Sequence, residues 1–450
     1  MNHTTAQPPD REARSPWSRY NEKAEVRVMP AGSPIEGTIT IPGSKSLTNR
    51  ALIIAAMAEG TSRVKGILKS DDSYWCIEAL RRLGIEVELE DDTAVIAGGG
   101  GSWPVQQGEL YFGAAGTIAR FLPGALAAGN GIWRLTGSAR LSERPLAPLL
   151  DTLSSLGADI RFDEASGRLP LTLHARGIWG GEAVMSGSTS SQFISGMILA
   201  APYAQSPLTV RINGPVVQRD YVELTLDMMR AFGVDPKSGE DGQTIAVPAG
   251  KYTAQSIALE PDVSTCGYFW SLAALTNGRI RIDGITAGTR QPDIELLDVL
   301  EKMGCSVTRG NDFVEVRGTR QLKGGFTVSM KRWSDQTLTV AALAAFADGP
   351  ITLTDAAHIR HHECDRIAAI CTELTKAGIR VDEHPDGLTV YPGEPTPALL
   401  DTHDDHRMAM ALSLLAVKAD GIRIADPGCV SKTCPDYWER FQALGIEVQL

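Results

Sequence analysis

The sequence predicts an α/β protein built from six similar modules in two lobes, with the most apolar helices buried. Two periodic features predict this fold: a glycine that ends an amphipathic helix, and a second, more apolar helix that recurs between these glycines. A chain of 450 residues is also too long for one core, because single cores stop growing at about 250–300 residues. Six modules therefore predict two lobes of three.

The glycine series follows amphipathic helices and precedes strands, as in ALRRLGIEVEL and TLSSLGADIRF. A glycine just past a helix supplies the positive φ of a C-cap, and the alternating residues that follow it predict a strand. Several of these strands turn through polar residues into a second strand, which predicts a hairpin. The six glycines stand at positions 84, 157, 233, 304, 378 and 445, with spacings of 73, 76, 71, 74 and 67 residues.

The apolar helices form the second series, and each is opened by a small or acidic residue. Their predicted first residues are Ser44, Gly116, Ser190, Ser264, Asp335 and Asp405, with spacings of 72, 74, 74, 71 and 70 residues. Helices that are apolar on all sides must be interior, covered by sheets and by the amphipathic helices. Each module is therefore a helix–strand–strand–helix unit, and equivalent helix ends should point in one direction, toward the gap between lobes.

Composition limits the classes of partner and compartment. The net charge of -11 argues against a nucleic-acid-binding surface, which needs a basic field. The sequence has no apolar run near the ~20 residues of a membrane span and no secretory signal at its start. Seven scattered cysteines without paired metal spacing predict a reduced, cytoplasmic protein. Residues 1–23 are expected to be a flexible tail.

Basic residues stand near several helix starts, where they are unexpected. A cation at a helix N-terminus is unfavourable by about 0.3–1 kcal/mol unless an anion lies nearby. Lys45 stands at the first start, Arg120 lies one turn into the second helix, and Arg407 stands at the sixth. An ion pair with a neighbouring acid explains any one of them, but repetition in equivalent places predicts an anion site of helix N-termini.

Seven motifs resemble those of the 5-enolpyruvylshikimate-3-phosphate synthase family, from about residue 28 to the C-terminus. They are PGSKSLTNRALIIAAMA, GAAGTIARF, LTGSARLSERP, SSQFISGMILAAP, HHECDR, DDHRMAMALSL and DPGCVSKTCPDYWE. The resemblance implies an inside-out α/β barrel fold, with two lobes of three β-α-β-α-β-β repeats. It places residues 24–43 with 259–450 in one lobe and 44–258 in the other, with the active site in the cleft between them.

The resemblance also implies the reaction. The enolpyruvyl group of phosphoenolpyruvate moves to the 5-hydroxyl of shikimate-3-phosphate through a tetrahedral intermediate, and phosphate is released. The reaction needs an acid, a base and charge stabilisation in a site shut off from water. The family implies no metal or other cofactor, a monomer, and the herbicide glyphosate as an inhibitor.

Site residues carry over by motif position, so each is what the resemblance implies. The catalytic candidates are Lys45, Asp335 and Glu363. The candidates for shikimate-3-phosphate are Lys45, Ser46, Arg50, Ser190, Ser191, Gln192, Tyr221, Asp335, His358 and His362. The candidates for phosphoenolpyruvate are Lys45, Gly116, Arg140, Gln192, Arg366, Arg407 and Lys432.

Two of these residues also have purely structural interpretations. Asp335 is the proposed base, but an aspartate at this position is also a good N-cap. Glu363 is the proposed proton donor to C3, but it also stands three residues before Arg366, as in a helical ion pair.

Three departures from the family's motifs bear on substrate binding. Ala114 replaces an asparagine near the phosphoenolpyruvate pocket, and His358 and His362 stand where an asparagine and a lysine contact the shikimate ring. A protonated His362 would replace the lysine charge, with pH dependence near neutrality. A third motif keeps only Tyr221. Gly116 leaves the space that glyphosate occupies in this family, so sensitivity is expected.

Three other kinds of protein would share some of these sequence features. A sister enzyme that uses a UDP-amino sugar, or one that uses a variant cyclitol, would share the fold; the former lacks the paired SKS and SSQ motifs present here. A nucleotide-binding enzyme is suggested by GSKS and by the glycine run at 98–101, but neither motif is complete. A P-loop needs glycine directly before its lysine, where this chain has Ser44, and GGGGSW does not match the dinucleotide-binding pattern G-x-G-x-x-G. A non-catalytic anion-binding scaffold would not need the full set of acid, base and cations.

Overall fold

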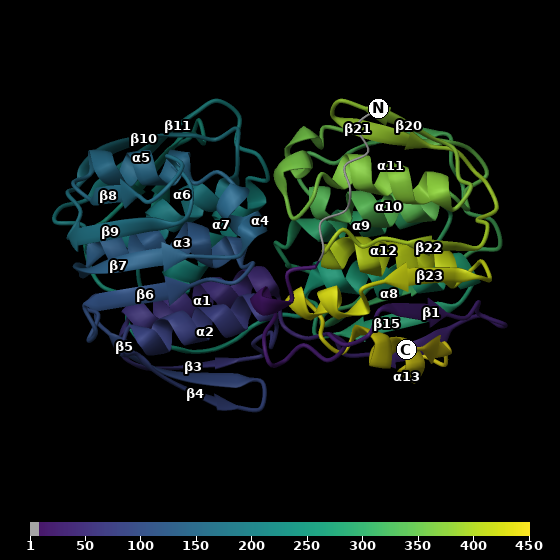
Figure 1. Cartoon of the computed structure of the whole chain (residues 1–450), viewed down its shortest axis with the longest axis horizontal. Helices are drawn as coiled ribbons and strands as arrows, with labels where there is room; N and C mark the ends of the chain where they lie inside the picture. The colour runs from purple at the N-terminus through teal and green to yellow at the C-terminus, as the bar shows by residue number, and fades with distance from the viewer. Residues whose placement is uncertain (1–8) are drawn as a thin grey trace. The chain divides into compact units, whose positions relative to one another are not determined.

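The computed structural model describes residues 9–450, and the chain divides into two compact units. Unit 1 consists of Met1–Pro42 and Glu260–Leu450, and unit 2 is the continuous stretch Gly43–Leu259. Each unit has three four-stranded sheets and its own set of buried helices (Figure 1).

Unit 2 contains three sheets of one design, in which the first two strands are parallel and the other neighbours antiparallel. The strand orders are β14 (Ser256–Ala258), β3 (Glu59–Lys65), β5 (Thr93–Gly99), β4 (Glu86–Glu90); β6 (Gln107–Tyr111), β7 (Asn130–Thr136), β9 (Leu171–Arg176), β8 (Asp159–Phe162); and β10 (Gly181–Ser186), β11 (Leu208–Asn213), β13 (Thr244–Val247), β12 (Lys237–Ser238). The inner helices are α1 (Lys45–Met57), α3 (Gly116–Ala128) and α6 (Ser191–Ala200), and the amphipathic helices are α2 (Asp71–Arg82), α5 (Ala147–Ser155) and α7 (Asp220–Ala231). A short helix, α4 (Ala139–Glu143), precedes α5.

Unit 1 repeats this design with the same arrangement of parallel and antiparallel neighbours. The strand orders are β16 (Ser306–Arg309), β17 (Phe313–Arg317), β15 (Arg279–Asp283), β2 (Glu36–Ile39); β18 (Phe326–Ser329), β19 (Ile351–Thr354), β21 (Gly387–Val390), β20 (Val381–His384); and β22 (Ala398–Leu400), β23 (Ile422–Ala425), β1 (Glu25–Val28), β24 (Val448–Gln449). The inner helices are α8 (Val263–Thr276), α10 (Thr337–Ala344) and α12 (His406–Ala416), and the amphipathic helices are α9 (Leu296–Lys302), α11 (Arg366–Lys376) and α13 (Tyr437–Ala443). The 3₁₀ turns are η1 (Arg11–Ala13), η3 (Pro292–Glu295), η4 (Ser334–Gln336), η5 (Ala357–His361) and η6 (Pro427–Lys432).

Three modules run β-α-β-α-β-β continuously along the chain. In the other three, one strand comes from a distant part of the sequence. In unit 2, β14 at the end of the unit supplies the strand parallel to β3, with Ile257 opposite Val64. In unit 1, β2 comes before unit 2 in the chain and its module resumes at α8. The last sheet of unit 1 is completed by β1, where Val28 lies opposite Val448. The first strand therefore belongs with the C-terminal sheet, as the family resemblance implied.

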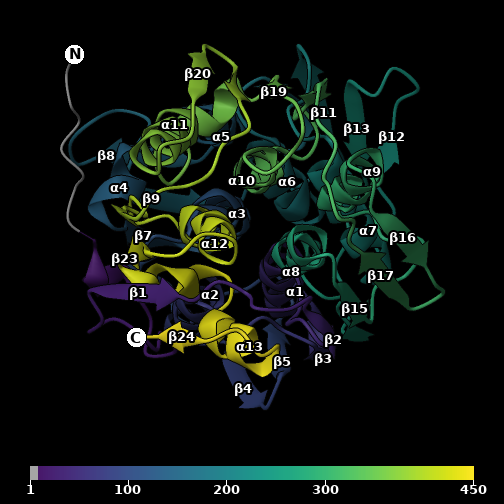
Figure 2. The same cartoon turned by 90° about the vertical axis from the view of Figure 1, so that its right-hand side faces the viewer.

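Both periodic features of the sequence are confirmed. All six glycines of the series have positive φ, between 80° and 103°. The residues of α8 from Val263 to Leu275 are all buried, and its two inner neighbours pack against it. Figure 2 shows α8, α10 and α12 of unit 1 close to end-on. In unit 2 the inner helices approach so closely that a Cβ added at Gly196 of α6 would lie 1.9 Å from the carbonyl oxygen of Arg120.

Two predicted first residues are wrong: α8 begins at Val263, one residue before Ser264, and α10 begins at Thr337, two residues after Asp335. The cap of α8 is Asp262 rather than Ser264, since the Asp262 carboxylate accepts a hydrogen bond of 2.8 Å from the Thr265 N–H. The fifth inner helix begins at Thr337, because Asp335 lies in the preceding turn η4.

The predicted flexible tail is wrong for residues 9–23; residues 1–8 of that prediction lie outside the described residues. The side chain of Arg14 is only 4% exposed and pairs with Asp404 at 3.0 Å and with Asp426. Nothing in the sequence indicated these ion pairs, because the two carboxylates lie 390 and 412 residues away from Arg14. No helix in the described part of the chain is long and apolar enough to cross a membrane.

Candidate active site

The residues predicted for the site fall into two groups, one in each unit, and each group lies at the starts of that unit's inner helices. In unit 1, the Gln336 amide donates to the Ser264 carbonyl at 2.8 Å, and Asp335 accepts from Arg407 at 2.8 Å. These two bonds join the starts of α8, α10 and α12. In unit 2, Asn49 of α1 donates to Thr117 of α3 at 2.8 Å.

Arg366 is the centre of the unit 1 group. Its guanidinium donates to Asp335 at 2.9 Å, to Glu363 at 2.9 Å, and to Asp405 at 2.7 and 3.2 Å. Arg366 is the first residue of α11, and its side chain is buried. The ion pair with Glu363 confirms the structural interpretation of that residue and leaves its chemical role open to test.

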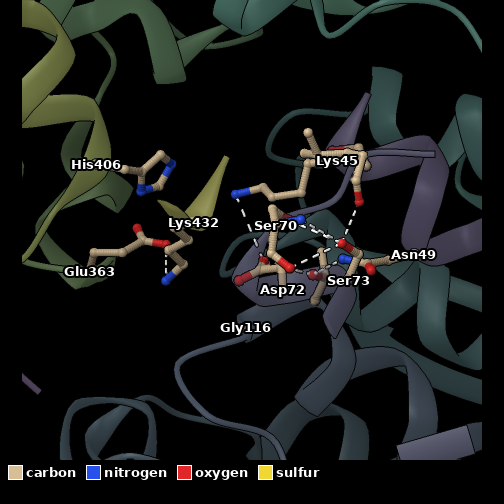
Figure 3. A network of polar contacts seen from close by, with 12 residues as sticks. Lys45, Asn49, Ser70, Asp72, Ser73, Gly116, Glu363, His406 and Lys432 are labelled. Atoms are coloured by element: carbon tan, nitrogen blue, oxygen red, sulfur yellow. Dashed lines mark hydrogen bonds and ion pairs between the residues drawn. The ribbon is translucent and has the colours of Figure 1, made fainter. Parts of the chain in front are cut away.

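Cations and carboxylates alternate across this group in the order Lys432, Glu363, Arg366, Asp335, Arg407. The ammonium of Lys432 lies 3.1 Å from Glu363, and Asp335 uses both oxygens to bridge the two arginines. Figure 3 shows the contact between Glu363 and Lys432. Asp335 lies in the turn η4, two residues before α10 begins, and each of its oxygens accepts from one of the two arginines.

The carboxylates keep both arginines charged. Burial alone would lower the pKa of Arg366, but Asp405, Glu363 and Asp335 hold it above its ordinary value. Burial opposes the charge of Arg407 in the same way, and Asp335 makes the largest contribution that raises its pKa. These two guanidiniums are therefore fixed, permanently charged donors.

The two histidines of the group contact neighbouring side chains through their ring nitrogens. Burial lowers the pKa of His358 to about 4, although Asp335 opposes the shift, and its Nε2 lies 2.7 Å from the Ser334 hydroxyl. His362 Nδ1 lies 3.2 Å from Arg366 Nη1, which has only protons to offer. Nδ1 therefore accepts in this contact with Arg366.

One carboxyl of this group was not found from the sequence. Asp293 in η3 is 1% exposed and accepts a hydrogen bond from the Ser264 hydroxyl. Burial raises the pKa of Asp293 to about 7, Asp335 adds to the shift, and Arg407 opposes it. The QPDIELL stretch has no pattern that separates this residue from a surface acid at a helix start.

The unit 2 group begins with Lys45, the first residue of α1. Its ammonium lies 3.9 Å from Asp72, which is 2% exposed and also accepts from Thr117 at 3.3 Å. Figure 3 shows the Lys45 side chain directed at Asp72, with Asn49 and Gly116 near the same helix starts in unit 2. Asp72 was not found from the sequence, because a Ser-Asp-Asp helix start is ordinary capping chemistry.

Arg50 is buried among neutral groups. It donates to the Thr225 hydroxyl at 2.7 Å and to the carbonyls of Ser46 and Tyr221 at 2.8 and 2.9 Å. No carboxylate within residues 9–450 forms an ion pair with it, and burial lowers the pKa of Arg50 to about 10. The ring of Phe121 lies 4.8 Å below the guanidinium. The hydrogen-bond partners of this buried cation in the described part of the chain are therefore hydroxyl and carbonyl oxygens.

Gly116, the first residue of α3, lies beside two arginines. An added Cβ would be 2.6 Å from Arg120 Nη1 and 2.8 Å from Arg144 Nη1. The third arginine, Arg140, which was predicted for this pocket, lies on α4, is 37% exposed and pairs with Glu143 at 2.8 Å. Arg144 was not among the sequence candidates, and Arg120 was noted only for its place in the helix.

The serine motif lies at the start of α6. The Ser190 hydroxyl caps this helix by accepting from the Gln192 N–H at 3.2 Å, as predicted for a helix opener. Ser191 is buried and Gln192 is half-buried. Tyr221, near the start of α7, accepts from Arg50 through its carbonyl oxygen. Ser46 does the same from within α1.

The two units of three modules are the fold of the enolpyruvyl transferases. EPSP synthase from Acinetobacter baumannii superposes with a TM-score of 0.80 at 27% sequence identity, over 95% of this chain and 100% of that chain. The enolpyruvyl transferase NikO from Streptomyces tendae has the same fold, with a TM-score of 0.75 at 21% identity over 95% of this chain and 99% of that chain. The predicted fold class is confirmed.

Sequence comparison identifies one family within this class. The family model for EPSP synthase (3-phosphoshikimate 1-carboxyvinyltransferase) matches residues 29–441. The 3-phosphoshikimate 1-carboxyvinyltransferase 2 of Halalkalibacterium halodurans is 53% identical over 442 residues, 98% of this chain and 98% of that protein. The 3-phosphoshikimate 1-carboxyvinyltransferase of Nostoc punctiforme is 42% identical over 418 residues, 92% and 98% of the two chains. This chain belongs to the EPSP synthase family.

Proposed function

We propose that this protein transfers the enolpyruvyl group of phosphoenolpyruvate to the 5-hydroxyl of shikimate-3-phosphate and releases phosphate. This is 3-phosphoshikimate 1-carboxyvinyltransferase activity, in the shikimate route to aromatic amino acids. Membership of the family supports the reaction. The observation that carries the residue assignments is the alternating order Lys432, Glu363, Arg366, Asp335, Arg407 in unit 1.

Phosphoenolpyruvate is assigned to the three cations of this alternating group, Lys432, Arg366 and Arg407. Its phosphate and carboxylate suit guanidinium groups, which bind such anions through two parallel hydrogen bonds. Arg366 and Arg407 now donate to Asp335. When phosphoenolpyruvate takes over these donors, the oxygens of Asp335 become available to accept a proton. Gly116, Arg140 and Gln192 are assigned to the same ligand.

The first chemical step joins the 5-oxygen of the acceptor to C2 of phosphoenolpyruvate. Asp335 takes the hydroxyl proton, and Glu363 delivers a proton to C3, which becomes a methyl group. Lys432 lies 3.1 Å from Glu363 and can reprotonate it. Positioned acids and bases of this kind contribute about 10²–10⁴ in rate. In the second step the Glu363 carboxylate, not yet reprotonated, takes back a methyl proton and the C2–C3 double bond re-forms. Phosphate departs with the electrons of its C–O bond and takes up the proton held by Asp335.

Shikimate-3-phosphate is assigned to the unit 2 residues and the two histidines. Arg50 supports this assignment best, because it is a buried cation without a carboxylate partner among the described residues. The remaining assigned donors are Lys45, Ser46, Ser190, Ser191, Gln192, Tyr221, His358 and His362. Lys45 is placed between the two ligands, and the histidines contribute as hydrogen-bonding groups.

The proposal also places the enzyme in the cytoplasm as a monomer and makes glyphosate an inhibitor. All seven cysteines are unpaired thiols, which supports a reducing compartment. Sedimentation at micromolar concentration tests the oligomeric state.

Phosphate release from phosphoenolpyruvate tests the function directly. The purified protein is assayed with shikimate-3-phosphate and, separately, with UDP-N-acetylglucosamine. Release only with shikimate-3-phosphate is expected. Release with the sugar nucleotide would instead identify the sister activity, and no release with either acceptor would support a non-catalytic scaffold.

A further inference from the structure

Residues 9–24, before β1, pack against the rest of unit 1, although they precede the family match that begins at residue 29. The anchor of this segment is Arg14, whose side chain is 4% exposed. Burial of an arginine is unfavourable unless acceptors of opposite charge pair with it.

Arg14 joins two loops of unit 1. Its Nη2 donates to Asp404 at 3.0 Å and also to Asp426. The backbone N–H of Asp10 adds a 3.2 Å bond to the second oxygen of Asp404. Next to Asp426, a Cβ added at Gly428 would lie 2.6 Å from Arg14 Nη1, so the fit leaves no space for a side chain there.

The carboxylate of Asp426 depends on this contact. It is 7% exposed, and within residues 9–450 it has no ion-pair partner other than Arg14. Both joined aspartates also have left-handed backbone, with φ of 52° at Asp404 and 47° at Asp426. Non-glycine residues rarely adopt this conformation, so the surrounding structure must hold it.

Each joined loop leads directly into a cation of the proposed phosphoenolpyruvate site. Asp404 precedes Asp405, which caps α12 by accepting from the Arg407 N–H at 2.9 Å and also binds Arg366. Asp426 precedes η6, which ends at Lys432. The same guanidinium therefore contacts the residues that lie just before α12 and η6, the two elements that carry Arg407 and Lys432.

We propose that Arg14 is a positioning residue for phosphoenolpyruvate, acting through Asp404 and Asp426 to hold Arg407 and Lys432 in their binding geometry. The inference rests on the proposed roles of those two cations. A single guanidinium nitrogen, Nη2, serves both carboxylates with its two protons. Nη1 donates instead to Asn21 at 3.3 Å.

The test measures the KM for each substrate, kcat and Tm in Arg14→Ala, Arg14→Lys and a matched control, Arg19→Ala. Arg19 is in the same segment, but its pair with Glu439 is exposed at the surface. Loss of charged hydrogen bonds in Arg14→Ala is expected to raise the KM for phosphoenolpyruvate about tenfold, with less than about a twofold change for shikimate-3-phosphate. The KM for phosphoenolpyruvate of Arg14→Lys is expected to lie between those of the parent and of Arg14→Ala. The KM values of Arg19→Ala are expected to match those of the parent.

If Arg14→Ala does not fold, Asp404→Asn keeps the shape of the contact while removing one charge, and the same selective rise in KM is expected at smaller size. A lower Tm with unchanged KM values would overturn the proposal and leave Arg14 a purely structural residue. Arg407→Lys and Lys432→Met test the proposed binding site separately from the positioning role of Arg14. If neither variant raises the KM for phosphoenolpyruvate, the assignment of these two cations to the binding site fails. If both raise it and Arg14→Ala does not, only the positioning role fails.

Discussion

Replacing His358 with asparagine should remove a specific acid sensitivity from the folding of unit 1. The half-buried imidazole lies 2.7 Å from the Ser334 hydroxyl, and burial lowers the pKa of His358 from 6.5 to about 4. Between these two values the unfolded chain binds a proton that the native protein excludes. Stability is therefore fully present above pH 6.5 and is lost as the pH falls toward 4.

The size of the effect follows from the shift. A displacement of one pKa unit corresponds to about 1.4 kcal/mol, so the full loss by pH 4 is on the order of 3 kcal/mol. At pH 5 the loss attributable to this group is about 2 kcal/mol relative to pH 8. His358→Asn has no titrating imidazole at this position. The difference in unfolding free energy between parent and variant should therefore change by about 2 kcal/mol between pH 8 and pH 5.

Urea unfolding at several pH values between 5 and 8 measures this difference. Any constant effect of the substitution on packing cancels, because only the change with pH is used. His361→Asn, an exposed residue of the same turn η5, shows how much of the signal comes from removing an imidazole near the surface. A parent–variant difference that does not vary with pH would refute the inference that His358 is held neutral.

Three further predictions concern the site. Glu363→Gln should lower kcat by about 10²–10⁴ and slow the exchange of deuterium from solvent into C3 of phosphoenolpyruvate; loss of kcat with unchanged exchange would show that another group protonates C3. Gly116→Ala should raise the Ki of glyphosate by about tenfold or more, and the KM for phosphoenolpyruvate by much less, because the new methyl group obstructs the inhibitor more than the smaller substrate; equal rises would contradict this steric account. Asp293→Asn should gain stability relative to the parent as the pH rises from 4 to 8, on the order of 3 kcal/mol, because the raised pKa makes ionisation of the native carboxyl unfavourable; pH-dependent urea unfolding checks this, and a constant difference would exclude a buried neutral acid.

The sequence predicted the repeating architecture well because backbone requirements leave local marks. Gly84 and its five equivalents must adopt positive φ after a helix, so their spacing revealed the modules directly. An all-apolar helix such as α8 likewise has only one stable place, the interior. The helix boundaries were less certain, since Asp262 and Ser264 are both acceptable caps and only the hydrogen bond to Thr265 decides between them.

Side-chain partnerships were predicted less completely, because they depend on residues brought together over long distances in sequence. The motif position of Arg140 gave no indication that it would pair with Glu143 in this structure while Arg144 lies against Gly116. Asp293 and Asp72 were indistinguishable from ordinary acids near helix starts. Their burial is a property of the assembled helix ends, which no single motif contains.

The way the modules are interrupted determines when each unit can be completed during synthesis. Unit 2 has all twelve of its strands once β14 has been made, because its first and last strands both lie within Gly43–Leu259. The strands β1 and β2 are translated before all of these, yet their partners β15, β23 and β24 come later, the last at Val448–Gln449. Nascent unit 1 must therefore keep its earliest strands unpaired while all of unit 2 is made, and its last sheet is complete only after Val448–Gln449 has been translated.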